Sequence, residues 1–122
     1  MIKFNSVTLD AEMVLGDTGT FSITPKLDGE TYLTDDDTLY FTVKERRRKD
    51  DSDKTEEQLT KISKEITEFN SGTATIPIES SDTSSLPAGT YIYDIKVVRG
   101  DGTVDTLTPN GQAYFTLKKG VR

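Results

Sequence analysis

The chain has 122 residues, a formal net charge of −6 and neither Cys nor His. The absence of these residue types excludes Ser–His–Asp and Cys–His nucleophiles and removes Cys and His ligands for zinc. The acidic charge argues against a nucleic-acid partner, because the phosphates would repel it. The length predicts one domain over residues 1–122, with a thin core because only 33% of the residues are hydrophobic.

The first residues, 1–6, contain no apolar run long enough for a signal peptide or a membrane span. We therefore expect synthesis in the cytoplasm, without a membrane partner. Because the chain cannot form disulfides, its stability is expected to come from the core alone.

Along the chain, apolar residues recur mostly at every second position, which is typical of strands with one buried face. In chain order, this alternation predicts strands around residues 7–9, 21–23, 39–43, 74–78, 91–98, 104–108 and 113–117. Turn signals rich in Gly, Asp and Ser separate these segments, and no helix of core size is expected. Seven or eight short strands with such turns indicate an all-β antiparallel sandwich.

One segment, residues 55–69, carries two conflicting signals. Its apolar residues have a heptad-like spacing, and Thr55 with Gln58 could form a capping box, which together describe an amphipathic helix. The Asn-Ser-Gly sequence at residues 70–72 is instead typical of a hairpin turn that follows a strand. We favour a strand over roughly residues 61–69, with the helix as the alternative.

The chain enters its longest predicted strand through a corner. Asp82 can cap one short helical turn near residues 82–86, and Gly89 lets the chain swing into the strand. In immunoglobulin-type sandwiches, a Tyr at this corner bonds through its hydroxyl to the upstream backbone, two residues before a core Cys. Tyr91 takes the place of that Tyr, and Tyr93 the place of the Cys. We therefore favour an immunoglobulin-like sandwich over an ordinary capped turn before a strand.

A family resemblance rests on the motif Gly-x-Tyr-x-Tyr-Asp-Ile at residues 89–95, preceded by Asp82-Thr83 and followed by residues 102–106. This pattern resembles the N-terminal immunoglobulin-like module of baseplate upper proteins, from tailed phages of Gram-positive bacteria. Residues 16–23 and 37–44 extend the resemblance over most of the chain.

The resemblance implies a non-enzymatic structural component of a virion that docks on the baseplate or tail. Other virion proteins would be its partners, and it would be present in multiple symmetric copies. Its location would be the virion, after synthesis in the host cytoplasm. Baseplate upper proteins continue into long C-terminal regions that hold receptor-binding proteins, whereas this sequence ends at Arg122. We therefore expect the docking module alone.

Two alternative functions stay open. A single short domain also suits a capsid decoration protein that binds the major capsid protein. The fold class equally supports a carbohydrate- or cell-surface-binding adhesin module. The absence of Trp, a residue that commonly stacks on sugars, counts against the adhesin.

Candidate interface residues lie on the predicted outward faces of strands. Tyr40 and Tyr114 alternate with the inward-facing Phe41 and Phe115, and Ile92 and Val98 face away from Tyr91. Tyr is enriched at the centres of protein interfaces, because it combines a large rigid area with one hydrogen-bonding group. The alternative is a set of scattered surface aromatics.

A basic cluster, Arg46, Arg47 and Arg48, is a further candidate for docking against an acidic neighbour. The acidic residues at 50, 51 and 53 follow at once and would largely cancel its field. A solvated loop with locally paired charges is therefore the interpretation we prefer.

Two other patterns are assigned to turns. The aspartates at residues 35–37 cannot all point at one cation, so they predict a turn in which Asp side chains bond to the nearby backbone. The Arg-Gly-Asp sequence at residues 99–101 spells the integrin-binding tripeptide, but its Gly and Asp are residues that a hairpin turn requires.

No enzyme activity and no cofactor are expected. A glycosidase pair needs two carboxyls about 5 to 10 Å apart in a cleft. Nothing in the sequence selects such a pair from the 21 acidic residues.

Overall fold

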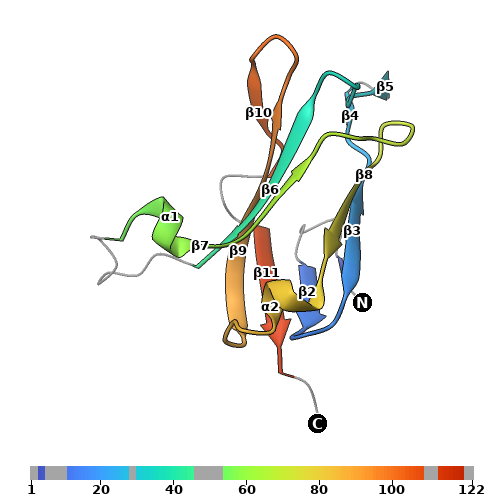
Figure 1. Cartoon of the computed structure of the whole chain (residues 1–122). Coiled ribbons are helices and arrows are strands. Elements are labelled where there is room, and N and C mark those ends of the chain that lie inside the picture. Colours follow the sequence, from blue (N-terminus) through green and yellow to red (C-terminus); the bar gives the residue numbers. More distant parts are fainter. Residues whose placement is uncertain (1–2, 5–10, 28–29, 46–53, 109–112, 120–122) are drawn as a thin grey trace.

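The computed structural model describes residues 3–4, 11–27, 30–45, 54–108 and 113–119. In these ranges the chain forms eleven strands and two four-residue helices (Figure 1). The elements are β1 (Lys3–Phe4), β2 (Ala11–Val14), β3 (Gly19–Ile23), β4 (Lys26–Leu27), β5 (Glu30–Thr31), β6 (Thr38–Lys44), α1 (Glu56–Leu59), β7 (Thr60–Ile66), β8 (Ala74–Ile78), α2 (Ser80–Thr83), β9 (Gly89–Val98), β10 (Val104–Thr106) and β11 (Ala113–Lys118).

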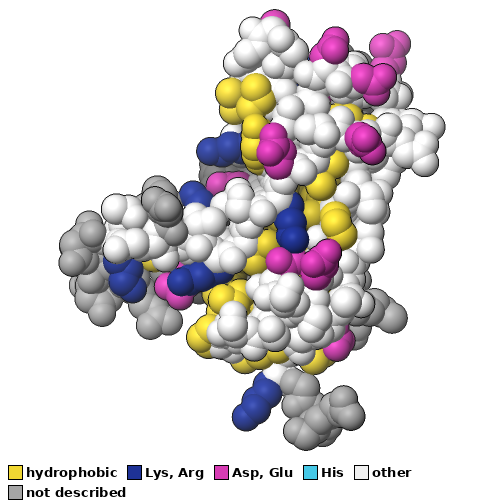
Figure 2. All heavy atoms as spheres, viewed as in Figure 1, with side chains coloured by type: hydrophobic (Ala, Val, Ile, Leu, Met, Phe, Trp, Pro, Cys, Tyr) yellow, Lys and Arg dark blue, Asp and Glu magenta, His cyan; other side chains and the backbone are white. Residues whose placement is uncertain are grey.

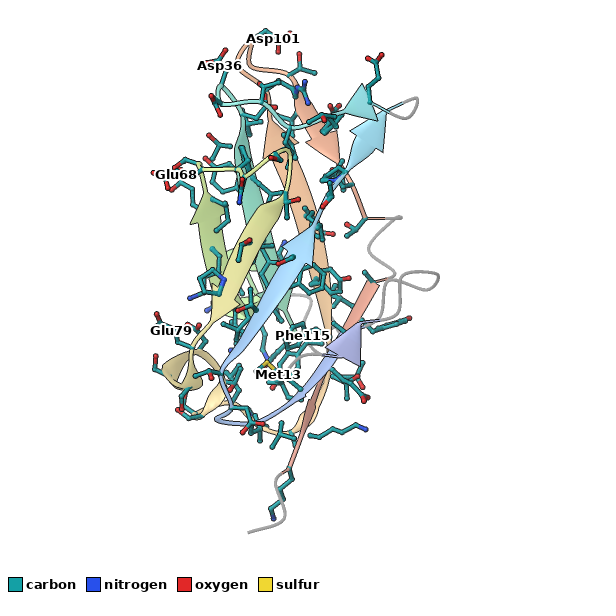
Figure 3. The ribbon with its side chains drawn as sticks, turned by 90° about the vertical axis from the view of Figure 1, so that its right-hand side faces the viewer. Met13, Asp36, Glu68, Glu79, Asp101 and Phe115 are labelled. Atoms are coloured by element: carbon teal, nitrogen blue, oxygen red, sulfur yellow. The ribbon has the colours of Figure 1, made fainter. Side chains whose placement is uncertain are left out.

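The strands are arranged in two layers. The main sheet has the order β1-β2-β11-β9-β6-β7, and β10 pairs along one edge of β9. β3 pairs with β8 in a small second sheet, and β4 with β5 in a short separate pair. Figure 3 shows β3 and β8 lying over the longer strands of the main sheet. The described residues therefore form an all-β sandwich, and the predicted fold class is confirmed at this level.

One pair of strands departs from the antiparallel prediction. β2 and β11 are parallel, with Phe115 opposite Ala11 and Leu117 opposite Met13. These strands come from opposite ends of the sequence, so no tight turn forces them to run in opposite directions. The prediction of a wholly antiparallel sandwich is therefore wrong at this position.

Most predicted strands are present. The segments at residues 21–23, 39–43, 74–78, 91–98 and 113–117 lie within β3, β6, β8, β9 and β11. The predicted strand at 104–108 is shorter and ends at Thr106. The first predicted strand, at residues 7–9, lies outside the described residues.

β2 was not predicted, although its residues alternate as a strand should. Ala11 and Met13 are buried, while Glu12 and Val14 are partly exposed. Ala is somewhat depleted in strands, and Met is not among the residues enriched in them. The local signal was therefore faint, and β2 takes its place in the main sheet through its pairing with β11.

Both signals in residues 55–69 correspond to real structure. The capping box forms, because the Thr55 N–H donates to Gln58 Oε1 at 2.8 Å and the Gln58 N–H donates to Thr55 Oγ1 at 3.2 Å. It caps only the single turn of α1, after which the chain continues directly as β7. The favoured strand is thus confirmed, but it ends at Ile66 rather than at residue 69.

The predicted hairpin turn at residues 70–72 connects the two sheets. Asn70 and Thr73 exchange two backbone hydrogen bonds of 3.0 Å. Ser71 and Gly72 have φ values of 53° and 81°, as a tight two-residue hairpin turn requires. β7 then belongs to the main sheet and β8 to the small one, so this turn carries the chain across the sandwich.

Four aromatic rings fill the middle of the core. Phe41, Tyr93 and Phe115 come from neighbouring strands of the main sheet, and Phe21 comes from the small sheet. The Phe21 ring centroid lies 5.6 Å from that of Phe41 and 5.9 Å from that of Tyr93. Tyr93, at the predicted place of a core Cys, therefore joins the two sheets by ring packing.

The corner before β9 contains the predicted tyrosine bond. The Tyr91 hydroxyl donates to the carbonyl oxygen of Pro87 at 2.7 Å, and Tyr91 is only 5% exposed. Gly89 begins β9 with a φ of 154°, in the region that favours glycine. The bond predicted from the Tyr91 hydroxyl to the upstream backbone is thus present, and Gly89 has a backbone conformation that favours glycine.

The helical turn at this corner differs from its prediction in two respects. α2 spans Ser80–Thr83, so it begins two residues before the expected range 82–86, and residues 84–86 form a non-helical turn. Asp82 does not begin the helix but is its third residue, and its carboxylate accepts the N–H of Glu79 at 2.7 Å. The capping bond therefore runs from the N–H of Glu79, the residue before the helix, to a side chain inside the helix. Glu79 has the extended backbone that is typical of a residue preceding a helix.

We expect Tyr91→Phe to lower the free energy of unfolding by about 1–3 kcal/mol, because the Pro87 carbonyl would lose its donor. Chemical denaturation of the two proteins measures the difference. Tyr40→Phe, which removes only a long hydrogen bond of 3.4 Å at an exposed site, is the matched control and should change stability far less. Equal losses in the free energy of unfolding for the two substitutions would show that the corner bond stabilises the fold no more than the hydroxyl of the control tyrosine does.

Asp82 also joins the two sheets through an ion pair. Its carboxylate lies 2.8 Å from Nζ of Lys64, which projects from β7 toward the small sheet. Figure 2 shows hydrophobic side chains visible between β7 and β8 on this side of the molecule. An inward-pointing lysine is one way in which natural proteins protect the edge strand of a sheet.

The pKa of Asp82 predicts a dependence of stability on acid. Burial tends to raise this pKa, but the hydrogen bonds from Lys64 and from the Glu79 N–H, with the charge of Lys64, lower it below the ordinary value of 3.8. A depressed pKa means that the stabilising contribution is complete above the unfolded-state pKa and is lost as the pH falls through the folded-state value. We expect Asp82→Asn to be less stable than the wild type at pH 7, with the difference beginning to shrink as the pH falls to about 4 and lost as it falls through the lower folded-state pKa. Denaturation at a series of pH values tests this; a difference that stays constant into acid would contradict it.

Candidate functional site

The outer face of the main sheet is the surface that carries the predicted interface residues. We define the outer face by the side chains that alternate with the buried ones on five strands. They are Thr38, Tyr40, Thr42 and Lys44 of β6; Ser63 and Glu65 of β7; Ile92, Asp94, Lys96 and Val98 of β9; Val104 and Thr106 of β10; and Tyr114 and Thr116 of β11.

The structure places all four described interface candidates on this one face. Tyr40 is the most exposed of them, at 36%. Tyr114 is directly opposite Ile92 across the β9–β11 pair, and both are partly exposed. Val98 lies at the far end of β9 and is also partly exposed. These residues come from three neighbouring strands and so form parts of a continuous surface.

Val104 is a further residue of this face that the sequence pattern did not identify as an interface candidate. It pairs with Val98 across the β9–β10 hairpin and is 58% exposed, so it belongs to the outer face. Tyr40 and Val104 are the two large hydrophobic side chains that are exposed within the described ranges. The usable signal was the hairpin itself, because register from Gly102 places Val104 beside Val98.

Charged residues flank Tyr40 on both sides. Lys96 of β9 and Glu65 of β7 are its direct neighbours across the sheet. The Tyr40 hydroxyl donates a long hydrogen bond of 3.4 Å to Glu65 Oε1. Farther along the main sheet, Lys118 and Glu12 form an ion pair of 3.1 Å between β11 and β2. The face therefore mixes apolar, basic and acidic groups.

The basic cluster Arg46, Arg47 and Arg48 lies outside the described residues. Glu45, the residue before them in the sequence, forms an ion pair of 3.6 Å with Lys61 of β7. The docking role of the three arginines stays a prediction.

A polar cluster fastens one end of the sandwich. Arg99 Nη1 donates to the Tyr32 carbonyl oxygen at 2.9 Å and lies 3.4 Å from Asp37 Oδ2. The guanidinium also lies 4.2 Å from the centroid of the Tyr32 ring, and the Tyr32 hydroxyl donates to the Asp105 carboxylate. Burial, with the hydrogen bond to Asp105, raises the pKa of Tyr32. These contacts bind the loop after β5 to the β9–β10 hairpin.

The two turn assignments at this end are confirmed. The Asp37 N–H donates to the Thr34 carbonyl oxygen at 3.1 Å, and Asp37 Oδ2 accepts the Thr34 N–H at 2.9 Å. In the other turn, Asp101 Oδ1 accepts the Thr103 N–H at 2.9 Å. Figure 3 shows Asp36 and Asp101, one from each turn, at the same end of the molecule.

The described residues offer no cluster of three or more His, Cys, Asp or Glu side chains that could hold a metal ion. Neither of the two short helices in the described ranges has the length or apolar character needed to cross a bilayer.

The fold and this face define the class of the protein as an all-β sandwich with a mixed apolar and charged sheet face. No protein-family model matches the chain, and no curated protein matches it either.

Proposed function

We propose that this protein is a non-enzymatic structural component of a tailed-phage virion, which docks on the baseplate or tail through the outer face. The observation that carries the proposal is the position of Tyr40 and Val104. Both large exposed hydrophobic side chains of the described residues lie on the same face of the main sheet. Exposed apolar groups that gather on one face are typical of protein interaction sites.

The phage assignment is supported by the sequence motifs at residues 89–95 and 102–106. In the structure these residues build the corner, the strand β9 and the hairpin that presents Val104. The residues that carry the resemblance therefore also form part of the proposed docking surface.

The sandwich is further assigned to the immunoglobulin-like type. The paired strands β6-β9-β11 correspond in order to strands C, F and G of that fold, and the pair β3–β8 corresponds to strands B and E. The hydroxyl of Tyr91 supports the same assignment, because it makes the bond found at the tyrosine corner. A rigid sandwich of this type could present the same face at every position of a symmetric assembly.

Binding to purified particles that lack this protein tests the proposal. The wild type should sediment with the particles, and Tyr40→Ser combined with Val104→Ser should bind at least about tenfold more weakly, because truncated hot-spot residues commonly lose that much. Thr20→Ser combined with Thr75→Ser, on the exposed face of the small sheet, is the matched control.

Two results would contradict the proposal. Normal binding by the Tyr40/Val104 variant would exclude the outer face as the docking surface. Failure of the wild type to bind, together with clear binding of the isolated protein on a glycan array, would favour the adhesin function instead.

A further inference from the structure

The row formed by Lys96, Tyr40 and Glu65 carries opposite charges on the two sides of an exposed ring. Lys96 and Glu65 are each directly opposite Tyr40 in the main sheet, on the flanking strands β9 and β7. Because neighbouring strands are about 4.8 Å apart, the two charged residues are separated by about 10 Å. Both are exposed, and neither takes part in an ion pair between described residues.

We infer that this row is the centre of a two-fold interface between two copies of the chain. The inference rests on the proposed docking role of the outer face, and it assigns the part of that face around Tyr40 to a second copy of the chain within the symmetric assembly. In a two-fold dimer the same patch is used on both copies, so a residue contacts its counterpart's neighbour reciprocally. The patch must therefore be complementary to itself.

The row satisfies this requirement for one orientation of the axis. When two outer faces meet about a two-fold axis parallel to β6 at Tyr40, β9 of one copy lies over β7 of the other. Lys96 then faces Glu65 of the second copy, and Glu65 faces Lys96 of the second copy. The two Tyr40 rings meet at the axis, where aromatic pairs can pack in an offset arrangement.

The charges also exclude the perpendicular orientation. An axis across the strands would place Lys96 against Lys96 and Glu65 against Glu65, and like charges brought together in an interface repel each other. The charge pattern thus selects a single arrangement, with the strands of the two sheets running in nearly the same direction.

Lys44, the lysine of β6 on this face, is compatible with this arrangement. It lies four residues along the strand from Tyr40. Aligned sheets pack with their strands crossed by about 30°, so points away from the axis separate sideways. The two Lys44 residues are therefore offset from each other, whereas the row at Tyr40 stays in register.

Sedimentation equilibrium of the isolated full chain over a concentration series tests the inference. The wild type should approach twice the 13.5 kDa mass of one chain. Lys96→Glu alone, or Glu65→Lys alone, places like charges opposite each other twice in the dimer. Each should raise the dimer dissociation constant about a hundredfold, and the combined swap Lys96→Glu/Glu65→Lys should restore the dimer.

Three controls test whether any loss of the dimer comes from the Lys96–Glu65 pairs. Lys119→Glu makes the same charge change at an exposed site beyond β11 and should leave the dimer intact. Added salt should weaken the wild-type dimer, because it screens exposed ion pairs. Thermal unfolding of each variant verifies that it is folded.

Each outcome bears directly on the inference. Weakening by both single changes and rescue by the swap would support it. A wild type that stays at the mass of one chain, or a dimer unaffected by the single changes, would overturn it. If a monomeric wild type still binds to particles, the proposed docking function stands without the dimer. If it does not bind, the sedimentation result overturns the dimer and the binding result overturns the docking function.

Discussion

Phe41→Ala is expected to lower the free energy of unfolding by about 3–5 kcal/mol, the largest effect of any substitution considered for this chain. Phe41 has no exposed surface and lies in the middle of the main sheet. Its ring packs against those of Phe21, Tyr93 and Phe115 at centroid distances of 5.6, 5.5 and 6.2 Å. Removing it leaves a cavity on the central strands, which cannot easily collapse because both neighbours of β6 are hydrogen-bonded to it.

Urea denaturation followed by Tyr fluorescence or circular dichroism measures this loss. Tyr40→Ala is the matched control. Tyr40 precedes Phe41 on the same strand, and its side chain lies on the opposite face and is 36% exposed. This substitution should change the stability of the monomer much less. A small loss for Phe41→Ala, below about 1.5 kcal/mol, would mean that the aromatic core is not packed as described.

Arg99→Met should lower the free energy of unfolding by about 2–4 kcal/mol, somewhat less than the usual loss for a buried ion pair because Arg99 itself is partly exposed. The side chain of Asp37 is only 2% exposed, and Arg99 is the cation in contact with it. Met retains much of the apolar stem of Arg but leaves the buried carboxylate without that cation. The substitution also removes the donor to the Tyr32 carbonyl oxygen and the cation over the Tyr32 ring.

A double-mutant cycle separates the ion pair from these other losses. Asp37→Asn can keep the bond from the Thr34 N–H through its amide oxygen. If the pair matters, the combined Arg99→Met/Asp37→Asn variant should lose less stability than the sum of the single losses. Strict additivity would show that Arg99 acts only through Tyr32. Lys119→Met, an exposed lysine, is the control for removal of a positive charge.

The strands of the core could be predicted because burial on one side imposes a period of two. Leu39, Phe41 and Val43 show this clearly, and all three have no exposed surface. The corner at Tyr91 could also be predicted, since its hydroxyl bond joins residues only four positions apart. Local patterns of this kind determine local structure directly.

Features that depend on long-range register could not be read in the same way. The parallel pairing of β2 with β11 has no local signature, because about 100 residues separate the two strands. The row of Lys96, Tyr40 and Glu65 exists only through the register of three strands. Arg99 was assigned to a turn, and its contact with Asp37 spans the distance between two loops that sequence spacing does not relate.

The outer face was predicted in part for the same reason. Alternation along one strand was enough to place Tyr40, Ile92, Val98 and Tyr114 on outward faces. That these faces belong to one sheet follows only from the strand order β11-β9-β6. Val104 belongs to the outer face because it pairs with Val98 in the β9–β10 hairpin.

Localisation of the protein by electron cryo-microscopy of the intact particle tests whether the outer face docks on the virion. We predict density for the sandwich on the virion, with the outer face containing Tyr40 and Val104 buried in a contact. Density at the tail tip would support docking on the baseplate, and density on the capsid lattice would assign the same module to decoration. Absence of the protein from the particle, or a position that leaves the outer face open to solvent in every copy, would exclude docking through this face.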